Sequence, residues 1–309
     1  MKILVTASTG NIGRRVLKEL MAPEFSVRVI TQNPERLPWE IRAQIEVVHG
    51  CTDHPATLRR ALEGVEALFW CVPTESLQET NARGYYERFA RSGSQAVRAA
   101  RTPRIVTISA GGKGLARKAS TLLGLHAMED ILNESGAAIR HLRCAPFMEN
   151  FARQLHSISH HGIFSYPLPG YIAIPMAAAS DIADSALRWL VRRDWNGIEP
   201  AAVHGPEDLT YNQAAAIIER VMERPVRYAE ASANQYAQWL VGAGASAEYA
   251  RSQVEMFAEF AQGINRVEPR TAGSTTPTTL SAWAESELLP LIESARPQSE
   301  TATVPVFEI

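Results

Sequence analysis

The chain has 309 residues, and its 33 acidic side chains nearly balance its 31 Lys and Arg side chains, for a formal net charge of −2 at pH 7. This length allows a substantial core, in one large domain or in one domain with an added lobe. The balanced charge argues against partners that are nucleic acids or anionic membranes. The three cysteines, Cys51, Cys71 and Cys144, lack metal-ligand spacing and predict buried thiols in a reducing compartment. Since there is no signal-peptide pattern and no apolar run of about 20 residues, we expect a soluble, cytoplasmic protein.

The first half alternates short apolar runs with stretches of helical pattern. The apolar runs are rich in β-branched residues and nearly continuous, which is typical of strands buried on both faces. Strands are predicted at 2–6, 26–31, 45–50, 67–72, 104–109 and 139–144, with helices at 11–22, 54–64, 79–100 and 120–135. This order predicts an α/β fold with a Rossmann-like, doubly wound parallel sheet.

The second half is predicted to be mainly helical. Helices are expected at 180–191, 210–223, 232–244 and 246–263, and several of them open on a Ser or Thr that can serve as N-cap. The predicted organisation is a nucleotide-binding domain over 1–150, with contributions from about 174–223, and a smaller lobe over 151–292. Residues 293–309, rich in Pro, Ser and Thr, are predicted to form a loose tail.

The stretch "VTASTGNIGRRV" (5–16) joins the first predicted strand to the first predicted helix. This is the context in which a glycine-rich loop binds a dinucleotide, with its phosphates at the helix N-terminus. Gly10 would let the backbone approach a pyrophosphate and Gly13 would let the helix pack close to the strand, whereas Ala7 replaces the glycine of the tight turn. The alternative is a turn that only connects the two elements. The cofactor-binding candidates here are Thr6, Ala7, Ser8, Thr9, Gly10, Asn11, Ile12 and Gly13.

The whole pattern up to about residue 292 resembles the NmrA-like branch of the atypical short-chain dehydrogenases/reductases. The resemblance is carried by "VTASTGNIGRRV", "GVEALFWCVP", "TISAGGKG", "HAMEDILNESG" and "LRCAPFMENF", and later by "IPMAAASDIADSAL", "HGPEDLTYNQAA" and "RTAGSTTPTTLSAWAE". It implies a Rossmann-like domain that binds NAD(P) and a small C-terminal lobe that helps to form a substrate cleft. Members of the family include quinone and azo-dye reductases and redox-sensing regulators.

The chain departs from the Tyr-x-x-x-Lys pair that short-chain dehydrogenases usually carry. The corresponding helix reads "HAMED", which places His126 and Asp130 on one helix face. One hypothesis makes His126 the proton donor, held in place by Asp130, because an unperturbed imidazole suits acid–base work at neutral pH. The equally weighted alternative is a histidine that packs under the cleft and bonds to the backbone. Lys113, nearby, is predicted to lie on a solvated loop, and no metal site is predicted, since the "HSISHHG" stretch (156–162) lacks a third ligand.

The residues at the end of the second predicted strand indicate whether the cofactor is NAD(H) or NADP(H). An acid at its end would bind the ribose 2′-hydroxyl of NAD, but Gln32 stands there, and Arg14 and Arg36 are candidates to hold a 2′-phosphate. NADP(H) is therefore favoured, with NAD(H) the alternative. Cys51 occupies the position that faces the adenine in the family, and Val72, Pro73 and Ser109, after the fourth and fifth strands, are further cofactor-binding candidates.

The substrate cleft should lie beyond the carboxyl ends of the strands. Its predicted rim is mostly apolar and aromatic, with substrate candidates Trp70, Phe147, Met148 and Asn150, although Trp70 and Phe147 fit the core equally well. Such a rim suits a flat or hydrophobic organic molecule better than a carboxylic acid. The favoured function is an NAD(P)H-dependent reductase of a small C=O, C=C, C=N or N=N acceptor. The alternative is a non-catalytic NAD(P)-binding sensor that reports to a protein partner.

Overall fold

The computed structural model describes residues 1–294, and the predicted tail over 293–309 lies almost entirely outside the described residues. The main sheet has the order β3-β2-β1-β4-β5-β6-β9, and all of its strand pairs are parallel. Its strands are β1 (Lys2–Val5), β2 (Ser26–Thr31), β3 (Glu46–His49), β4 (Ala67–Trp70), β5 (Arg104–Ala110), β6 (Ala138–Cys144) and β9 (Ile198–Val203). The predicted doubly wound, Rossmann-like parallel sheet is confirmed.

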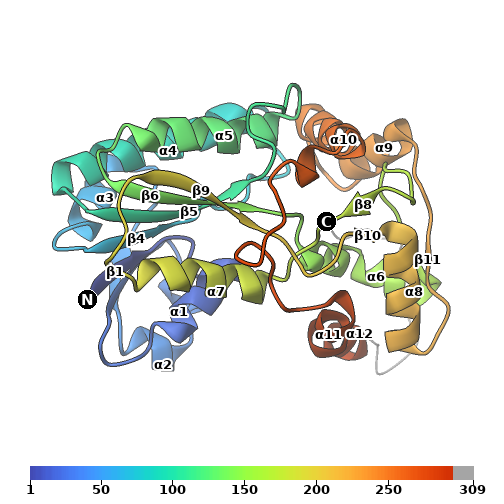
Figure 1. Ribbon diagram of the computed structural model, residues 1–309, viewed down its shortest axis with the longest axis horizontal. Coiled ribbons are helices and arrows are strands. Elements are labelled where there is room, and N and C mark those ends of the chain that lie inside the picture. Colours follow the sequence, from blue (N-terminus) through green and yellow to red (C-terminus); the bar gives the residue numbers. More distant parts are fainter. Residues whose placement is uncertain (295–309) are drawn as a thin grey trace.

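Helices cover both faces of this sheet (Figure 1). On one face lie α3 (Pro55–Ala61), α4 (Ala82–Ala100) and α5 (Ser120–Asn133), and on the other α1 (Asn11–Glu19) and α7 (Ala179–Leu190). The short η1 (Pro34–Arg36) and α2 (Trp39–Arg42) link β2 to β3. The prediction of strands buried on both faces holds for the centre of the sheet but not for β3, which is an edge strand with exposed Glu46 and His49.

The remaining elements gather at the carboxyl ends of the strands (Figure 1). Their helices are η2 (Met148–Gln154), α6 (Leu155–His161), α8 (Tyr211–Met222), α9 (Ala233–Gly242), α10 (Ala247–Ala261), η3 (Ile264–Arg266), α11 (Leu280–Trp283), η4 (Ala284–Leu288) and α12 (Leu289–Ser294). Two small sheets join β8 (Ala173–Ile174) to β10 (Leu209–Thr210) and β7 (Ile163–Phe164) to β11 (Arg227–Tyr228). These elements share a core of their own around Phe151, Phe164 and Trp283.

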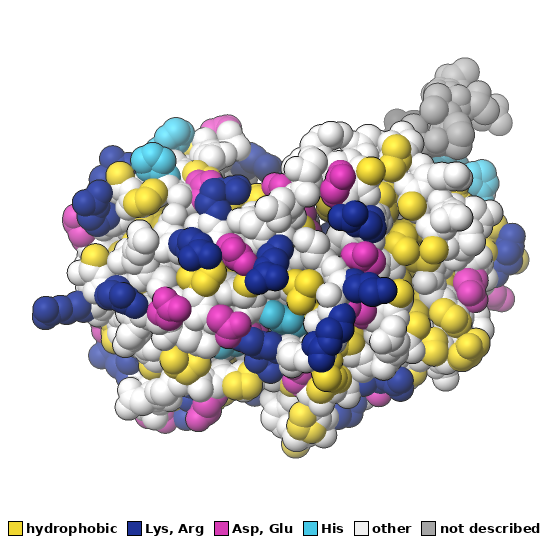
Figure 2. Space-filling model, turned by 90° about the horizontal axis from the view of Figure 1, so that it is seen from above, with side chains coloured by type: hydrophobic (Ala, Val, Ile, Leu, Met, Phe, Trp, Pro, Cys, Tyr) yellow, Lys and Arg dark blue, Asp and Glu magenta, His cyan; other side chains and the backbone are white. Residues whose placement is uncertain are grey.

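Three of the predicted Ser and Thr N-caps are present. The Thr210 and Ser232 hydroxyls each accept a hydrogen bond from the backbone three residues on and complete capping boxes with Gln213 and Gln235, and Ser246 caps α10. The fourth predicted helix begins earlier, with Ala178 as its N-cap. None of the helices in residues 1–294 is long and apolar enough to cross a membrane. Seen from above, Lys and Arg alternate with Asp and Glu over the half that holds the main sheet (Figure 2).

Candidate functional site

The strand order places a crevice beside β1. The chain runs outward from β1 through β2 to β3 and then returns to β4 on the other side, and ligands bind at such reversals. The loop after β1 and the residues after β4 meet there, tied together by Thr6: its hydroxyl lies 2.8 Å from the carbonyl oxygen of Cys71 and accepts from the Cys71 N–H. The Thr6 hydroxyl therefore links the end of β1 to the end of β4.

The predicted glycine-rich loop contains one residue in the left-handed backbone conformation. Ala7 adopts φ +48°, in the left-handed region, so a glycine would fit without the strain that alanine carries there. Its carbonyl accepts the Gly10 N–H at 2.9 Å. A Cβ atom at Gly13 would lie 2.1 Å from that same carbonyl oxygen, which confirms the predicted close approach of helix to strand.

The loop also fits a phosphate-bearing cofactor. Gly10 is the N-cap of α1, no side chain caps the helix, and its first turn carries no acid, so the first backbone N–H groups and the positive end of the helix dipole remain available. The Ser8 hydroxyl is 1% exposed and has no hydrogen-bond partner within residues 1–294. A polar ligand at this loop would satisfy groups that the protein leaves unpaired.

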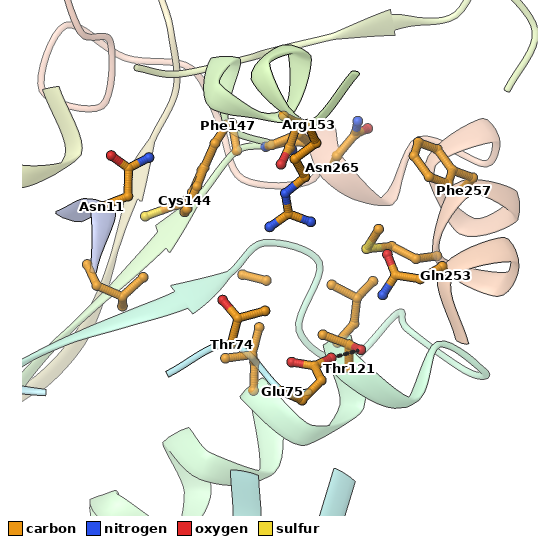
Figure 3. Close-up of a pocket in the computed structure, with 18 of the residues that line it drawn as sticks. Asn11, Thr74, Glu75, Thr121, Cys144, Phe147, Arg153, Gln253, Phe257 and Asn265 are labelled. Carbon is orange, nitrogen blue, oxygen red and sulfur yellow. Dashed lines mark hydrogen bonds between the residues drawn. The ribbon is translucent and has the colours of Figure 1, made fainter. Parts of the chain in front are cut away.

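A cavity of about 370 Å³ runs from this loop to the C-terminal helices. Ala7, Gly10, Asn11, Ile12 and Gly13 line one end, and Val72, Pro73, Ser109, Phe147 and Asn150 line the middle. The far end is walled by aromatic side chains of α9 and α10, among them Tyr236, Tyr249 and Phe257, of which Phe257 is labelled in Figure 3. Ten of the predicted cofactor and substrate residues are thus brought to one space.

Two predicted substrate residues lie elsewhere. Trp70 and Met148 are each 1% exposed and belong to the hydrophobic cores. The Trp70 indole packs so tightly against α4 that a Cβ atom at Gly93 would lie 2.7 Å from it. Neither side chain lines the cavity: Trp70, at the end of β4, faces the packed helices, as the alternative for this residue allowed, and Met148, at the start of η2, packs into the core of the C-terminal elements.

The candidates for the adenosine half of the cofactor do not line the cavity. Arg14, Gln32 and Arg36 are exposed at the start of α1 and beyond the end of β2, and Cys51 follows β3 next to Asp53. Among residues 1–294, no carboxylate forms an ion pair with Arg14 or Arg36, whereas Arg15 pairs with Glu287 at 2.9 Å. Their role in cofactor binding remains a proposal.

His126 and Asp130 do not form the predicted pair. The imidazole is 6% exposed, and its Nε2 lies 3.1 Å from the carbonyl oxygens of Ala110 and Gly111. The Asp130 carboxylate instead accepts from Lys113 Nζ at 2.6 Å. The predicted contact between His126 and Asp130 is therefore absent. His126 instead packs below the cleft and bonds to the backbone, which was the alternative hypothesis for this residue. Burial lowers its pKa, so the ring is neutral at pH 7.

A buried ion network lies at the position of the missing Tyr-x-x-x-Lys pair. Glu129, on α5, is 1% exposed and accepts from Ser109 Oγ at 2.7 Å and from Arg143 Nη2 at 2.8 Å. Lys113 Nζ lies 3.2 Å from the same carboxylate, so Lys113 is part of the network and not on a solvated loop as predicted. Glu268 joins from the C-terminal part by accepting the Gly112 N–H at 3.0 Å.

The thiols near the cavity are inert. Cys71 and Cys144 line it, and burial raises the pKa of Cys71 to about 12 and that of Cys144 higher still. Both are therefore protonated at neutral pH and are not nucleophiles. Within residues 1–294 there is no group of three or more potential metal ligands, and the rings of His156 and His160 are stacked on each other.

More than half of the lining residues were not anticipated from the sequence, among them Arg153, Tyr236, Tyr249 and Gln253. Tyr249 and Gln253 are four residues apart on a helix whose next lining residues, Met256, Phe257 and Phe260, are apolar. Such a polar pair on an otherwise apolar helix face could have been used to predict that this face lines a cavity. Arg153 offered no such pattern, because its cavity position depends on the packing of η2.

Comparisons with known proteins agree with this geometry. The model of the NAD(P)H-binding family matches residues 7–147. The chain is 29% identical over 283 residues to a (4-alkanoyl-5-oxo-2,5-dihydrofuran-3-yl)methyl phosphate reductase of Streptomyces griseus, covering 89% of this chain and 90% of the relative. It is 25% identical over 279 residues to an NAD(P)H azoreductase of Xenophilus azovorans, covering 88% and 93%.

Solved structures share the fold across most of their length. An NADPH-dependent quinone oxidoreductase of Escherichia coli in complex with NADPH superposes with a TM-score of 0.75 at 24% identity, covering 94% of this chain and 100% of that one. A mutant of NmrA superposes with a TM-score of 0.72 at 14% identity, covering 95% and 97%. The family match lies over the loop and sheet that form the crevice, and the relatives extend over the C-terminal helices. Residues 7–147 match the NAD(P)H-binding family, and most of the chain is similar in sequence to two reductases and shares the fold of the quinone oxidoreductase and of NmrA.

Proposed function

We propose that the protein is an NAD(P)H-dependent oxidoreductase that reduces a small, largely apolar organic acceptor such as a quinone, enone, imine or azo compound. The observation that carries this proposal is the single cavity that joins the glycine-rich loop to the aromatic wall of α9 and α10. A cofactor held at the loop and an acceptor against that wall would share one space. The azoreductase, the phosphate-ester reductase and the quinone oxidoreductase among its relatives support the same reaction class.

In this proposal, residues 1–150 hold the cofactor and residues 151–292 cover the acceptor. NAD(P)H, when bound, supplies the hydride. The protein contributes the phosphate-binding loop and the strip Ser109–Gly111, which lines the cavity and is held from below by His126 and Glu129. The wall of aromatic side chains orients a flat acceptor and limits the access of water.

The test is the decay of NADPH absorbance with a panel of quinones, enones, imines and azo compounds. We expect turnover of at least one acceptor class, with the cofactor bound at micromolar concentration or below. Tight cofactor binding without turnover of any acceptor, together with capture of a protein partner, would instead identify a redox sensor.

We further propose that the proton is taken from water and that His126 is a positioning residue. Its Nε2–H is directed at two backbone carbonyls and its ring is neutral at pH 7, so it is poorly placed to donate to the acceptor. His126→Asn should therefore keep kcat within about threefold, and the wild-type rate should be flat from pH 6 to 8. A fall of about 10²-fold with unchanged cofactor affinity, and a wild-type rate that declines as the pH rises, would restore the donor hypothesis.

We propose NADP(H) as the preferred cofactor, held by Arg14 and Arg36. Hydrogen bonds to charged groups contribute roughly 1.5–3 kcal/mol each, so replacing both residues with Ala should weaken NADPH binding by about 100-fold or more. NADH, which lacks the 2′-phosphate, should bind within about threefold of wild type. Equilibrium titration by nucleotide fluorescence checks this result. A matched control is Arg59→Ala with Arg60→Ala on α3, which removes the same charge from exposed positions outside the cavity; equal weakening of both cofactors would contradict the assignment.

A further inference from the structure

One cation in the cavity has no carboxylate partner. Arg153, on η2, lines the cavity, and its guanidinium points toward the middle, above Thr74 and Glu75 (Figure 3). The residue is exposed, and within residues 1–294 its side chain forms no hydrogen bond or ion pair. The neighbouring Glu149 accepts the Ala179 N–H at 3.0 Å, and Glu75 accepts from the Tyr86 and Thr121 hydroxyls.

The surroundings of Arg153 supply further donors, and Glu75, the carboxylate that lines the same cavity, forms no ion pair with it and accepts from Tyr86 and Thr121. Tyr236, Tyr249 and Gln253 line the same cavity, and neither the two hydroxyls nor the Gln253 amide has a hydrogen-bond partner within the described part of the chain. Burial raises the pKa of both tyrosines, and the charge of Arg153 offsets this rise in part. Both phenols therefore remain protonated at physiological pH and can donate a hydrogen bond. Both lie close enough to Arg153 for its charge to act on them.

These donors differ from the rest of the lining, which is dominated by apolar and aromatic side chains. A planar guanidinium flanked by phenol donors matches an oxyanion, such as a carboxylate, sulfonate or phosphate. We propose that Arg153, with Tyr236 and Tyr249, binds an oxyanion carried by the acceptor, so that the substrate is an apolar ring system with one anionic group. This inference rests on the proposed function, and it differs from the sequence-based expectation in allowing a carboxylate or another oxyanion on the acceptor.

A matched pair of acceptors tests the proposal: 1,2-naphthoquinone-4-sulfonate and the uncharged 1,2-naphthoquinone. Arg153→Gln should raise KM for the sulfonate by about 10- to 100-fold, the range expected for loss of one charge-assisted hydrogen bond, and leave KM for the uncharged quinone within about threefold. Arg153→Lys should retain part of the preference. The control is Arg251→Gln, which removes an exposed arginine of α10 that does not line the cavity, and it should change neither value.

Two further results would overturn the inference. Equal losses with both quinones would show that Arg153 only maintains the cavity. A matching loss of NADPH affinity would show that the oxyanion belongs to the cofactor's own phosphates.

Equilibrium binding separates this inference from the proposed function. Binding of the sulfonate to the NADP⁺-loaded protein can be followed by quenching of tryptophan fluorescence, since Trp239 lines the cavity. Arg153-dependent binding without reduction of any acceptor would remove the proposed function and keep the oxyanion site. Reduction of acceptors without an effect of Arg153 on sulfonate binding would keep the function and remove the site.

Discussion

Replacing Gly13 with Leu is expected to weaken NADPH binding by at least 100-fold while the protein stays folded. The Cβ atom alone would lie 2.1 Å from the Ala7 carbonyl oxygen and 2.8 Å from its carbonyl carbon, and these are backbone atoms that cannot rotate away. The helix N-terminus must then move away from β1, and the N–H groups that face a phosphate move with it. Overpacking of this kind costs about 1–3 kcal/mol of stability, which a protein of this size can withstand.

Two other substitutions make this test specific. Gly242→Ala changes a glycine of α9 around which there is open space, so NADPH affinity should be unchanged. Ala7→Gly changes the same loop but should stabilise the protein, whereas Gly13→Leu destabilises it. Glycine adopts a left-handed backbone without the strain that alanine has there, so the free energy of unfolding should rise by roughly 1 kcal/mol. Fluorescence titration and thermal unfolding measure both effects. Unchanged affinity in Gly13→Leu would show that the loop is only a connection between strand and helix.

The loop shows what local sequence can predict. Two glycines between a strand and a helix were sufficient to predict the tight turn and the close approach of α1 to β1. The sign of φ at Ala7 was not predictable, because both values are compatible with an alanine in the sequence, and only the course of the chain between β1 and α1 selects +48°. The structure therefore adds a strained residue at the expected site.

The main sheet also contains strands that the local sequence predicts and one strand that it does not. Six strands of the main sheet were predicted from continuous apolar runs, and α1, α3, α4 and α5 from the helical patterns between them, whereas η1 and α2 were not predicted. The seventh strand, β9, was not, because its "IEPAAV" is mostly exposed and contains a proline. Its place beside β6 is set by pairing across about 60 residues of sequence, which no local pattern records.

The same reasoning explains the mixed result for the acceptor rim. Phe147 and Asn150 line the cavity, whereas Trp70 and Met148 are core. All four were chosen because they follow or end a strand, and position along a strand does not say which face a side chain occupies. Arg153, the residue that we propose to define the substrate, could not be recognised without the neighbouring helices.

The ion network below the cavity gives the second large effect. Glu129→Gln should lower the free energy of unfolding by about 3–5 kcal/mol, the usual cost of removing one partner of a buried ion pair. The substitution leaves Arg143 and Lys113 facing an uncharged amide, and Ser109 loses its carboxylate acceptor. Because Ser109 lines the cavity, we also expect a lower kcat in a variant that binds NADPH normally. Glu87→Gln on α4 is the control: this glutamate pairs with Arg83 and Arg91 at the surface, and its loss should cost less than about 1 kcal/mol.

The dependence on pH identifies the charge of Glu129 as the cause. Burial alone would raise its pKa, but hydrogen bonds from Arg143 and Ser109 and the positive charges nearby lower it to about 2, from an ordinary value of 4.5. A carboxylate with a lowered pKa in the folded state stabilises the protein above pH 4.5, and this contribution is lost as the pH falls toward 2. The difference in unfolding free energy between wild type and Glu129→Gln, measured in urea, should therefore be largest at pH 6–7 and shrink steadily between pH 4.5 and 2.5. A difference that stays constant over this range would mean that the variant loses packing or hydrogen bonds rather than a charge, and the network would then stabilise the fold by its shape alone.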